Sequence, residues 1–116
     1  MAETIFSKII RREIPSTIRF EDEDFIVIND IHPKAPVHVL IIPKKAYESL
    51  EAVDLNDDVF YVKLLKKARQ VAKELDISDN YKLFMNVGKK LQGVQHLHLH
   101  LMGGWKSKEE SSLFNE

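Results

Sequence analysis

The chain of 116 residues holds five histidines, and all of them fall within residues 32–38 and 96–100. Three of them, His96, His98 and His100, alternate with leucines in the run HLHLHL. Successive side chains of a β-strand point to opposite faces, so this run places three imidazoles on one face and the leucines on the other. The leucine face can pack in a core. The histidine face must therefore line a polar site.

Nucleophilic catalysis is one chemistry that this face allows. A neutral imidazole can attack phosphorus near pH 7, form a phosphohistidine-type intermediate and leave again. We predict His98 as the nucleophile because it has an imidazole on each side. The chain has no cysteine, so imidazole is the strongest nucleophile it offers. The glycine-containing loop at residues 88–95 supplies backbone N–H groups that can hold phosphoryl oxygens.

Zinc binding is the competing interpretation. A His-x-His pair can chelate zinc, and His38 can add a ligand from a neighbouring strand. However, alternate residues of a strand lie ~6.6 Å apart, so three such imidazoles rarely converge on one tetrahedral ion. The segment between Tyr81 and Lys108 contains no Asp or Glu, so a carboxylate that orients an imidazole must come from elsewhere. The residues alone leave both interpretations open.

The composition is that of one ordinary globular domain. Hydrophobic residues make up 44% and charged residues 30%, and 17 basic residues balance 18 acidic ones for a net charge of −1. This balance disfavours a nucleic-acid partner but allows a small anionic ligand. We see no signal peptide and no run of the ~18 apolar residues that a membrane span needs. We expect a single cytoplasmic domain over residues 1–116, with its core at about 4–104 and a polar tail at 105–116.

Two helices and five strands must position the histidines. Apolar periodicity predicts helices at residues 4–12 and 54–75. Strand patterns cover residues 17–21, 25–29, 37–42, 81–87 and 96–102. We expect Thr4 to cap the first helix and Asp54 or Asn56 to cap the second. Residues 37–42 are apolar on both faces except for His38, which indicates a central strand. Short connections exclude most parallel crossovers, so we predict an α+β fold on a mainly antiparallel sheet.

The run QHLHLHLMGG resembles the His-x-His-x-His motif of the histidine triad (HIT) superfamily. The segments IFSKIIRREIPS, EDEDFIVINDIHPKAPVHVLIIPKKA and YKLFMNVG resemble its Hint branch in order and spacing, over roughly residues 4–104. The resemblance implies a HIT-like fold of a five-stranded antiparallel sheet with two helices, usually paired into a homodimer. It also implies hydrolysis of purine nucleoside 5′-phosphoramidates, such as adenosine 5′-monophosphoramidate and AMP-lysine, through a nucleotidyl-histidine intermediate. The family needs no metal or other cofactor for this reaction.

The resemblance also implies roles for single residues. His98 matches the nucleophile, His96 and His100 match the flanking triad members, and His38 matches the fourth histidine of the network. Asp30 matches the carboxylate that accepts hydrogen bonds from the ribose hydroxyls. The remaining matches are apolar positions around the base at Ile31, Phe6, Ile9 and Ile28, a ribose and phosphate contact at Asn86, and the glutamine before the triad at Gln92.

The loop before the triad departs from the family pattern. Residues 86–96 are one residue shorter than usual, and Gly93 stands where many Hint proteins have a serine that contacts the phosphate or assists the leaving group. The lost hydroxyl would lower the rate or change the leaving-group preference. The alternative functions are hydrolysis of dinucleoside polyphosphates and a nucleotide-binding regulatory module with weak catalysis. We interpret His32, Lys89 and Lys90 as solvated loop residues.

Overall fold

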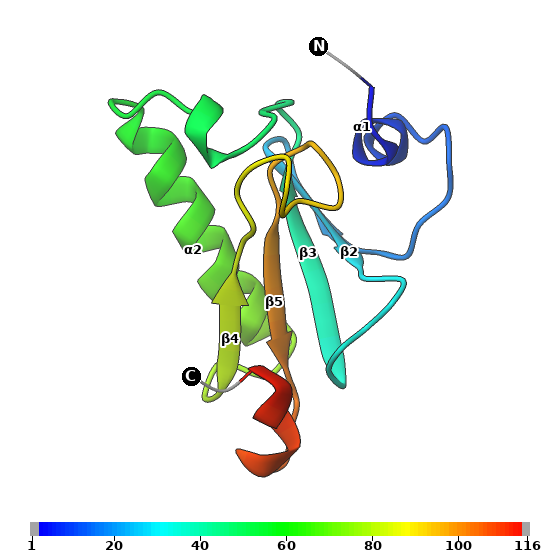
Figure 1. Ribbon diagram of the computed structural model, residues 1–116, viewed down its shortest axis with the longest axis vertical. Helices are drawn as coiled ribbons and strands as arrows, with labels where there is room; N and C mark the ends of the chain where they lie inside the picture. The colour runs from blue at the N-terminus through cyan, green and yellow to red at the C-terminus, as the bar shows by residue number, and fades with distance from the viewer. Residues whose placement is uncertain (1–2, 115–116) are drawn as a thin grey trace.

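The computed structural model describes residues 3–114 and arranges them around one five-stranded sheet (Figure 1). The strands are β1 (Ile18–Glu21), β2 (Phe25–Asn29), β3 (Val37–Pro43), β4 (Tyr81–Phe84) and β5 (Leu99–Gly103). Every pairing in the sheet is antiparallel, and the strand order is β1-β2-β3-β5-β4. The predicted α+β fold is confirmed, and β3 is its central strand.

Two α-helices cover opposite faces of the sheet, as Figure 1 shows. The short helix α1 (Ile5–Ile10) begins at a capping box, in which the Thr4 hydroxyl accepts from the Ser7 backbone N–H and the Ser7 hydroxyl accepts from that of Thr4. Thr4 is therefore the N-cap, as predicted. Phe6 and Ile9 form the buried side of α1, which packs on the sheet.

The long helix α2 (Asp58–Glu74) begins later than predicted. Its N-cap is Asp57, whose carboxylate accepts from the Phe60 N–H at 3.1 Å, so the expected cap at Asp54 or Asn56 is wrong. The reason is local, because the Asp54 carboxylate accepts from the Asn56 N–H at 2.8 Å and closes a separate turn. The 3₁₀ helix η1 (Leu50–Ala52) precedes that turn. Within residues 3–114, no helix has the length and apolar character to cross a bilayer.

Strand alternation divides the buried apolar residues into two clusters, one on each face of the sheet. The cluster under α2 contains Phe25, Val27, Val39, Ile41, Leu64, Ala68, Val71, Ala72, Ile77, Leu99 and Leu101. The cluster under α1 contains Phe6, Ile9, Ile26, Ile28, Leu40 and Ile42. Leu99 and Leu101 thus pack beneath α2, whereas the His98 ring contacts Phe6 of α1. The predicted separation of a leucine face from a histidine face is confirmed.

The histidine run lies only partly within a strand. β5 begins at Leu99, so His96 and His98 precede it, contrary to the predicted start at residue 96. The pairing of β5 with the neighbouring strand β3 stops at Leu99 and Ile41. The N–H of Leu97 instead donates to the carbonyl of Tyr47 at 2.8 Å, in the segment that follows β3. Two of the three triad histidines, His96 and His98, therefore lie in a segment that contacts the chain after β3, and His100 lies in the sheet.

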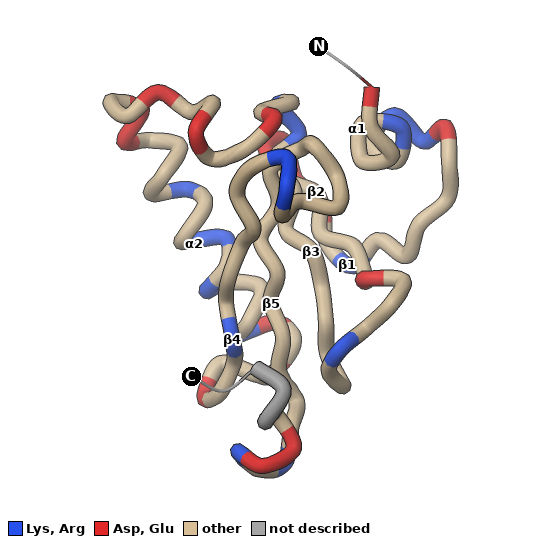
Figure 2. Tube along the Cα trace, in the orientation of Figure 1, with Lys and Arg blue, Asp and Glu red and all other residues tan. Residues whose placement is uncertain are grey.

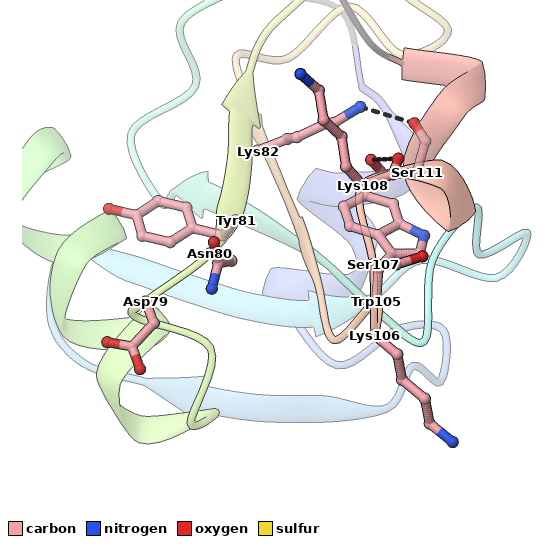
Figure 3. A pocket seen from close by; sticks show the side chains of 9 residues that line it. All are labelled: Asp79, Asn80, Tyr81, Lys82, Trp105, Lys106, Ser107, Lys108 and Ser111. Carbon is pink, nitrogen blue, oxygen red and sulfur yellow. Dashed lines mark hydrogen bonds between the residues drawn. The ribbon is translucent and has the colours of Figure 1, made fainter.

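The C-terminal tail packs against the beginning of β4 (Figure 3). Lys82 Nζ donates to the backbone carbonyl of Ser111 at 3.0 Å and lies 5.3 Å from the centre of the Trp105 ring. The 3₁₀ helix η2 (Glu109–Phe114) follows Trp105, and a cavity of about 630 Å³ lies between the tail and β4. Since Tyr81 pairs with Gly103, this is the end of the sheet remote from the start of β5.

Candidate active site

The four predicted histidines of the site lie together on the α1 face of the sheet. His38 comes from β3, His100 from β5, and His96 and His98 from the segment before β5. The ring centres of His98 and His100 are 5.2 Å apart, and those of His38 and His100 are 5.3 Å apart. His38, His96 and His98 are buried, and His100 is half-buried. The structure thus brings the predicted histidines into one cluster.

A backbone carbonyl fixes the orientation of His98. The Nδ1 atom of His98 lies 2.7 Å from the carbonyl oxygen of His96. A carbonyl only accepts hydrogen bonds, so in the neutral ring Nδ1 carries the hydrogen and Nε2 keeps its lone pair. Burial lowers the pKa of His98 by more than this hydrogen bond and the Asp30 charge raise it. At neutral pH, His98 therefore presents an uncharged, basic Nε2 atom, which is the state that a nucleophile needs.

His96 is held in the same manner, through its other ring nitrogen. Its Nε2 atom lies 2.7 Å from the carbonyl oxygen of Pro43 at the end of β3 and donates to it. Burial lowers the pKa of His96, and the Pro43 contact opposes that shift. The His96 ring is therefore a neutral anchor. Because the carbonyl of His96 holds His98, this anchor positions the His98 ring.

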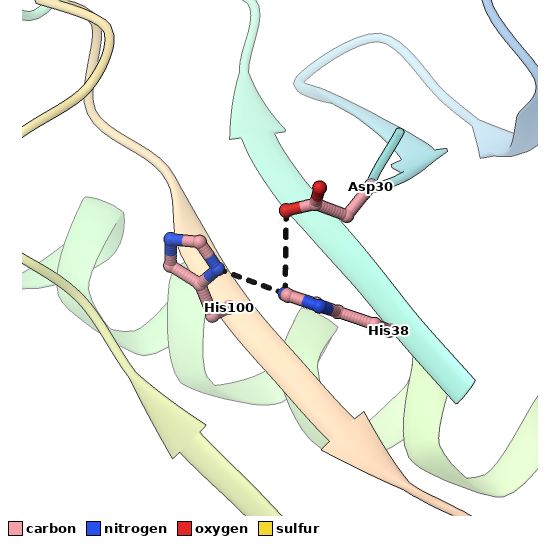
Figure 4. Close-up of side chains that lie close together, drawn as sticks. All are labelled: Asp30, His38 and His100. Atoms are coloured by element: carbon pink, nitrogen blue, oxygen red, sulfur yellow. Dashed lines mark hydrogen bonds and ion pairs between the residues drawn. The ribbon is translucent and has the colours of Figure 1, made fainter. Parts of the chain in front are cut away.

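The second pair, His38 and His100, is linked to Asp30 (Figure 4). The backbone N–H of Lys34 donates to His38 Nδ1 at 3.1 Å, so Nε2 of the neutral His38 ring carries the hydrogen. That Nε2 atom lies 3.0 Å from His100 Nδ1 and 3.4 Å from Asp30 Oδ2. Burial lowers the pKa of His38, and the Asp30 charge opposes this shift. Asp30 is the carboxylate that the segment around the triad lacks.

His100 completes the cluster as a neutral hydrogen-bond donor. Because its Nδ1 accepts from His38, the hydrogen of the neutral ring sits on Nε2. Burial, together with the neighbouring His98 and His38, lowers the pKa of His100 to about 4. His100 thus remains uncharged at neutral pH and can donate from Nε2 to an oxygen of a bound group.

Apolar residues border His98 on the α1 side. The Phe6 ring meets His98 edge to face, with ring centres 4.9 Å apart and an interplanar angle of 80°. Ile9 and Ile28 belong to the same buried cluster as Phe6. Ile31 is 78% exposed and directly follows Asp30. The predicted base-binding residues therefore combine a buried wall beside His98 with one exposed side chain.

The loop between β4 and β5 is held together by Gln92. Its Oε1 accepts from the Gly88 N–H at 2.9 Å, and its Nε2 donates to the carbonyls of Glu48 at 2.9 Å and Val94 at 3.0 Å. This buried amide ties the loop to the segment after β3, a role that sequence reasoning did not foresee. Asn86 is exposed just beyond β4.

The charged and polar side chains interpreted as solvated loop residues are exposed. Lys89 and Lys90 are exposed in the loop between β4 and β5, and Figure 2 shows a basic segment at the tip of this loop. His32 is exposed in the loop between β2 and β3, and its backbone N–H donates to Asp30 Oδ1 at 2.8 Å. The imidazole of His32 therefore differs from the other four in lying on the surface.

Sequence reasoning missed Phe84, which stacks on His100. The two ring centres are 4.7 Å apart, with an interplanar angle of 3°. Phe84 and His100 are direct partners in the pairing of β4 with β5. The only sequence signal is an aromatic residue in the strand before the triad. Its register relative to His100 depends on the length of the intervening loop, which the pattern of residues does not determine.

Three alternating histidines, backed by a fourth histidine and a carboxylate on a five-stranded antiparallel sheet, define the histidine triad class of proteins. The family model described as "Scavenger mRNA decapping enzyme C-term binding" matches residues 3–112. An uncharacterized HIT-like protein of Synechocystis is 51% identical over 106 residues, which cover 90% of this chain and 93% of that protein. The chain belongs to the histidine triad (HIT) family.

Two further similarities bear on the site. The solved structure of a HIT family hydrolase from Clostridium thermocellum superposes with a TM-score of 0.83 at 44% identity, covering 91% of this chain and 94% of that one. The 14 kDa zinc-binding protein of Zea mays is 42% identical over 104 residues, or 87% of this chain and 81% of that protein. The names of these two relatives describe a hydrolase and a metal-binding protein, respectively.

The lowered pKa of His100 predicts acid-sensitive stability. Between the ordinary histidine pKa of about 6.5 and the folded value of about 4, the unfolded chain binds a proton that the folded chain does not. The free energy of unfolding should therefore fall as the pH drops through this window and stay constant above it. We expect His100→Asn to reduce that loss by on the order of 2 kcal/mol, after a discount for partial exposure. Urea unfolding of both proteins at pH 7.5, 5.5 and 4.5 measures this change in the free energy of unfolding.

His32→Asn provides the matched control because His32 is exposed. It should retain the pH dependence of the wild-type protein. Equal pH dependence of the wild-type and His100→Asn proteins would contradict the burial of a neutral His100.

Proposed function

We propose that this HIT protein hydrolyses purine nucleoside 5′-phosphoramidates to a nucleoside monophosphate and an amine. The observation that carries the proposal is the state of His98, a buried neutral imidazole whose Nδ1–H is held by the His96 carbonyl. This bond leaves Nε2 as the nucleophilic atom. The similarity to a HIT family hydrolase supports a hydrolytic reaction. The resemblance of the chain to the Hint branch supports the phosphoramidate substrate.

In the first step, the lone pair of His98 Nε2 attacks the α-phosphorus. A bond forms between Nε2 and phosphorus while the bond from phosphorus to the amine nitrogen breaks. The amine takes a proton from a neighbouring imidazole or a bound water and departs. The Nε2–H of His100 is suited to donate a hydrogen bond to a phosphoryl oxygen, which stabilises the charge that accumulates there.

In the second step, water attacks the phosphorus of the nucleotidyl-His98 intermediate. The bond between phosphorus and Nε2 breaks. A proton of the attacking water returns to the imidazole or bound water that protonated the amine in the first step. The sum is one water consumed for one nucleoside monophosphate and one amine released. The His96 carbonyl stabilises positive charge on the His98 ring while the intermediate exists, because it accepts the Nδ1 hydrogen throughout.

The nucleotide is placed by the residues around this centre. Asp30 is half-buried, and we propose that its carboxylate accepts hydrogen bonds from the ribose hydroxyls. The proposed contacts to the base and to the rest of the nucleotide are Phe6, Ile9, Ile28, Ile31 and Asn86. Gln92 is proposed to act on the phosphate through the loop that its buried amide holds. The protein is proposed to act in the cytoplasm.

Substitution of the nucleophile tests the proposal. His98→Ala should reduce turnover of a fluorogenic adenosine phosphoramidate by about 10³-fold or more, because it removes the proposed covalent intermediate. His32→Ala is the control and should turn over like the wild-type protein. Rapid acid quenching followed by mass spectrometry should find a nucleotidyl adduct on His98 of the wild-type protein.

Two results would redirect the assignment. Equal turnover by the wild-type and His98→Ala proteins would overturn the proposed nucleophile. Faster turnover of a diadenosine polyphosphate than of the phosphoramidate would favour the alternative HIT hydrolase, and tight AMP binding without any turnover would favour a regulatory module.

We also propose that the reaction needs no metal. Asp30, His38 and His100 offer ligand atoms within 4.8 Å of one another, which is the arrangement that a zinc site would use. The hydrogen bonds of His38 oppose this use. A neutral His38 that binds metal through Nε2 carries its hydrogen on Nδ1, where it would meet the N–H of Lys34 at 3.1 Å. A metal at this position therefore costs the protein an existing hydrogen bond.

Metal removal separates the two interpretations. Protein treated with a chelator and shown to be free of zinc by elemental analysis should keep its phosphoramidase activity within twofold. Added zinc should inhibit, because it would compete for the nitrogen pair of His38 and His100. Loss of activity on chelation that zinc restores would instead establish the metal-dependent alternative.

A homodimer is the proposed assembly. The outer face of α2 exposes Val59, Val62 and Leu65, which are 65%, 50% and 57% accessible to solvent. Clusters of exposed apolar side chains of this kind favour a protein interface. β4 also lies at one edge of the sheet, and an edge strand is a place where a strand of a second chain can pair.

A charge on the apolar face of α2 should shift the dimer toward the monomer. Val62→Glu places a carboxylate among apolar neighbours in a dimer but in water in a monomer, so it should weaken association at least tenfold without unfolding the chain. Thr17→Glu adds the same charge near β1 at the other edge of the sheet and should leave association unchanged. Sedimentation velocity over a range of concentrations measures both. A wild-type monomer at all concentrations would refute the assembly.

A further inference from the structure

His100 is held differently from the other two histidines of the triad. The rings of His96 and His98 each bind a backbone carbonyl at 2.7 Å. The Nδ1 atom of His100, by contrast, accepts a hydrogen bond from the side chain of His38. His100 is also the half-buried member, and it lies in the strand next to the edge of the sheet. Its ring therefore needs a further constraint.

Phe84 supplies a flat surface at this position. Its ring lies parallel to that of His100, with an interplanar angle of 3° and 4.7 Å between the ring centres. The rings of His38 and His98 are tilted relative to His100 by 46° and 55°. Tilted neighbours contact a ring at an edge or a corner, whereas a parallel neighbour contacts the ring on its face. The Phe84 ring is thus the contact that determines the plane of His100.

We propose that Phe84 is a positioning residue, which holds the plane of the His100 ring so that Nδ1 meets His38 and Nε2–H is directed at the reacting phosphoryl group. A single hydrogen bond at Nδ1 leaves the ring free to tilt about that contact. Stacking removes this freedom. The kinetic consequence rests on the proposed phosphoramidase function, while the effect on the ring does not.

Stacking also matters because the His100 ring is held at Nδ1 by His38. A tilt about that contact would displace the other ring nitrogen, Nε2, together with its hydrogen. Misplacement of a catalytic group by about 1 Å can cost as much as 10²-fold in rate. Such an effect falls on the transition state rather than on nucleotide binding. A loss of stacking should therefore lower kcat and leave KM nearly constant.

The test compares two variants of Phe84 with a control in the same strand. Phe84→Leu retains an apolar side chain without a flat face, and Phe84→Tyr restores the flat face. We expect Phe84→Leu to lower kcat for the adenosine phosphoramidate about tenfold with KM within twofold, and Phe84→Tyr to remain near the wild-type value. Leu83→Ala is the control, because Leu83 packs in the α2 cluster on the opposite face. It should reduce the free energy of unfolding with kcat unchanged.

Nitrogen-15 spectra of the ligand-free protein give a readout that does not depend on activity. In the wild-type and Phe84→Tyr proteins, His100 should be a single tautomer with its hydrogen on Nε2, as the His38 contact requires. In Phe84→Leu it should become a mixture of the two tautomers.

The spectra and the kinetics have separate overturning results. A single Nε2–H tautomer in Phe84→Leu would overturn the positioning role, even if the wild-type protein proves inactive toward phosphoramidates. An unchanged kcat in Phe84→Leu, or an equal loss in Leu83→Ala, would overturn it as well.

Discussion

The hydrogen bond from His98 Nδ1 to the carbonyl of His96 decides which nitrogen of the proposed nucleophile keeps its lone pair. A side-chain partner could rotate or change its protonation state, but a peptide carbonyl can only accept. The acceptor is itself fixed, because the His96 ring donates to the carbonyl of Pro43 at the end of β3. The state of His98 is therefore determined by main-chain carbonyls, one at His96 and one at Pro43 at the end of the central strand. The pattern of protons on the rings follows from backbone geometry.

Burial lets several imidazoles lie close together. Their pKa values are lowered chiefly because a charged ring would lose its hydration, and His100 responds also to His98 and His38. At neutral pH the cluster is consequently uncharged and free of mutual repulsion. Asp30 is the opposing influence on His38, at 3.4 Å from its Nε2 atom. A ligand that engaged this carboxylate would alter the balance of charge at His38 and His100.

The architecture follows from the sequence because period-two and helical patterns each bury one face. The alternation of histidine and leucine was sufficient to separate the two faces, and it located the catalytic candidates. The sequence pattern did not predict details that depend on backbone contacts between segments distant in sequence. The late start of β5 results from the contact of Leu97 with Tyr47, and the cap of α2 moved because Asp54 formed a turn of its own. The role of Phe84 required the strand register, which a pattern of residue types does not contain.

The contacts that build this site join the two halves of the chain. His38 and His100 are 62 residues apart in sequence, His96 and Pro43 are 53 apart, and Gln92 and Glu48 are 44 apart. Contacts of such separation form only after large loops have closed, which makes them late and cooperative events in folding. Neither half of the chain alone contains both partners of these contacts. Reactive imidazoles of lowered pKa thus come into existence only when the domain is complete, so an incompletely synthesised chain presents ordinary histidines.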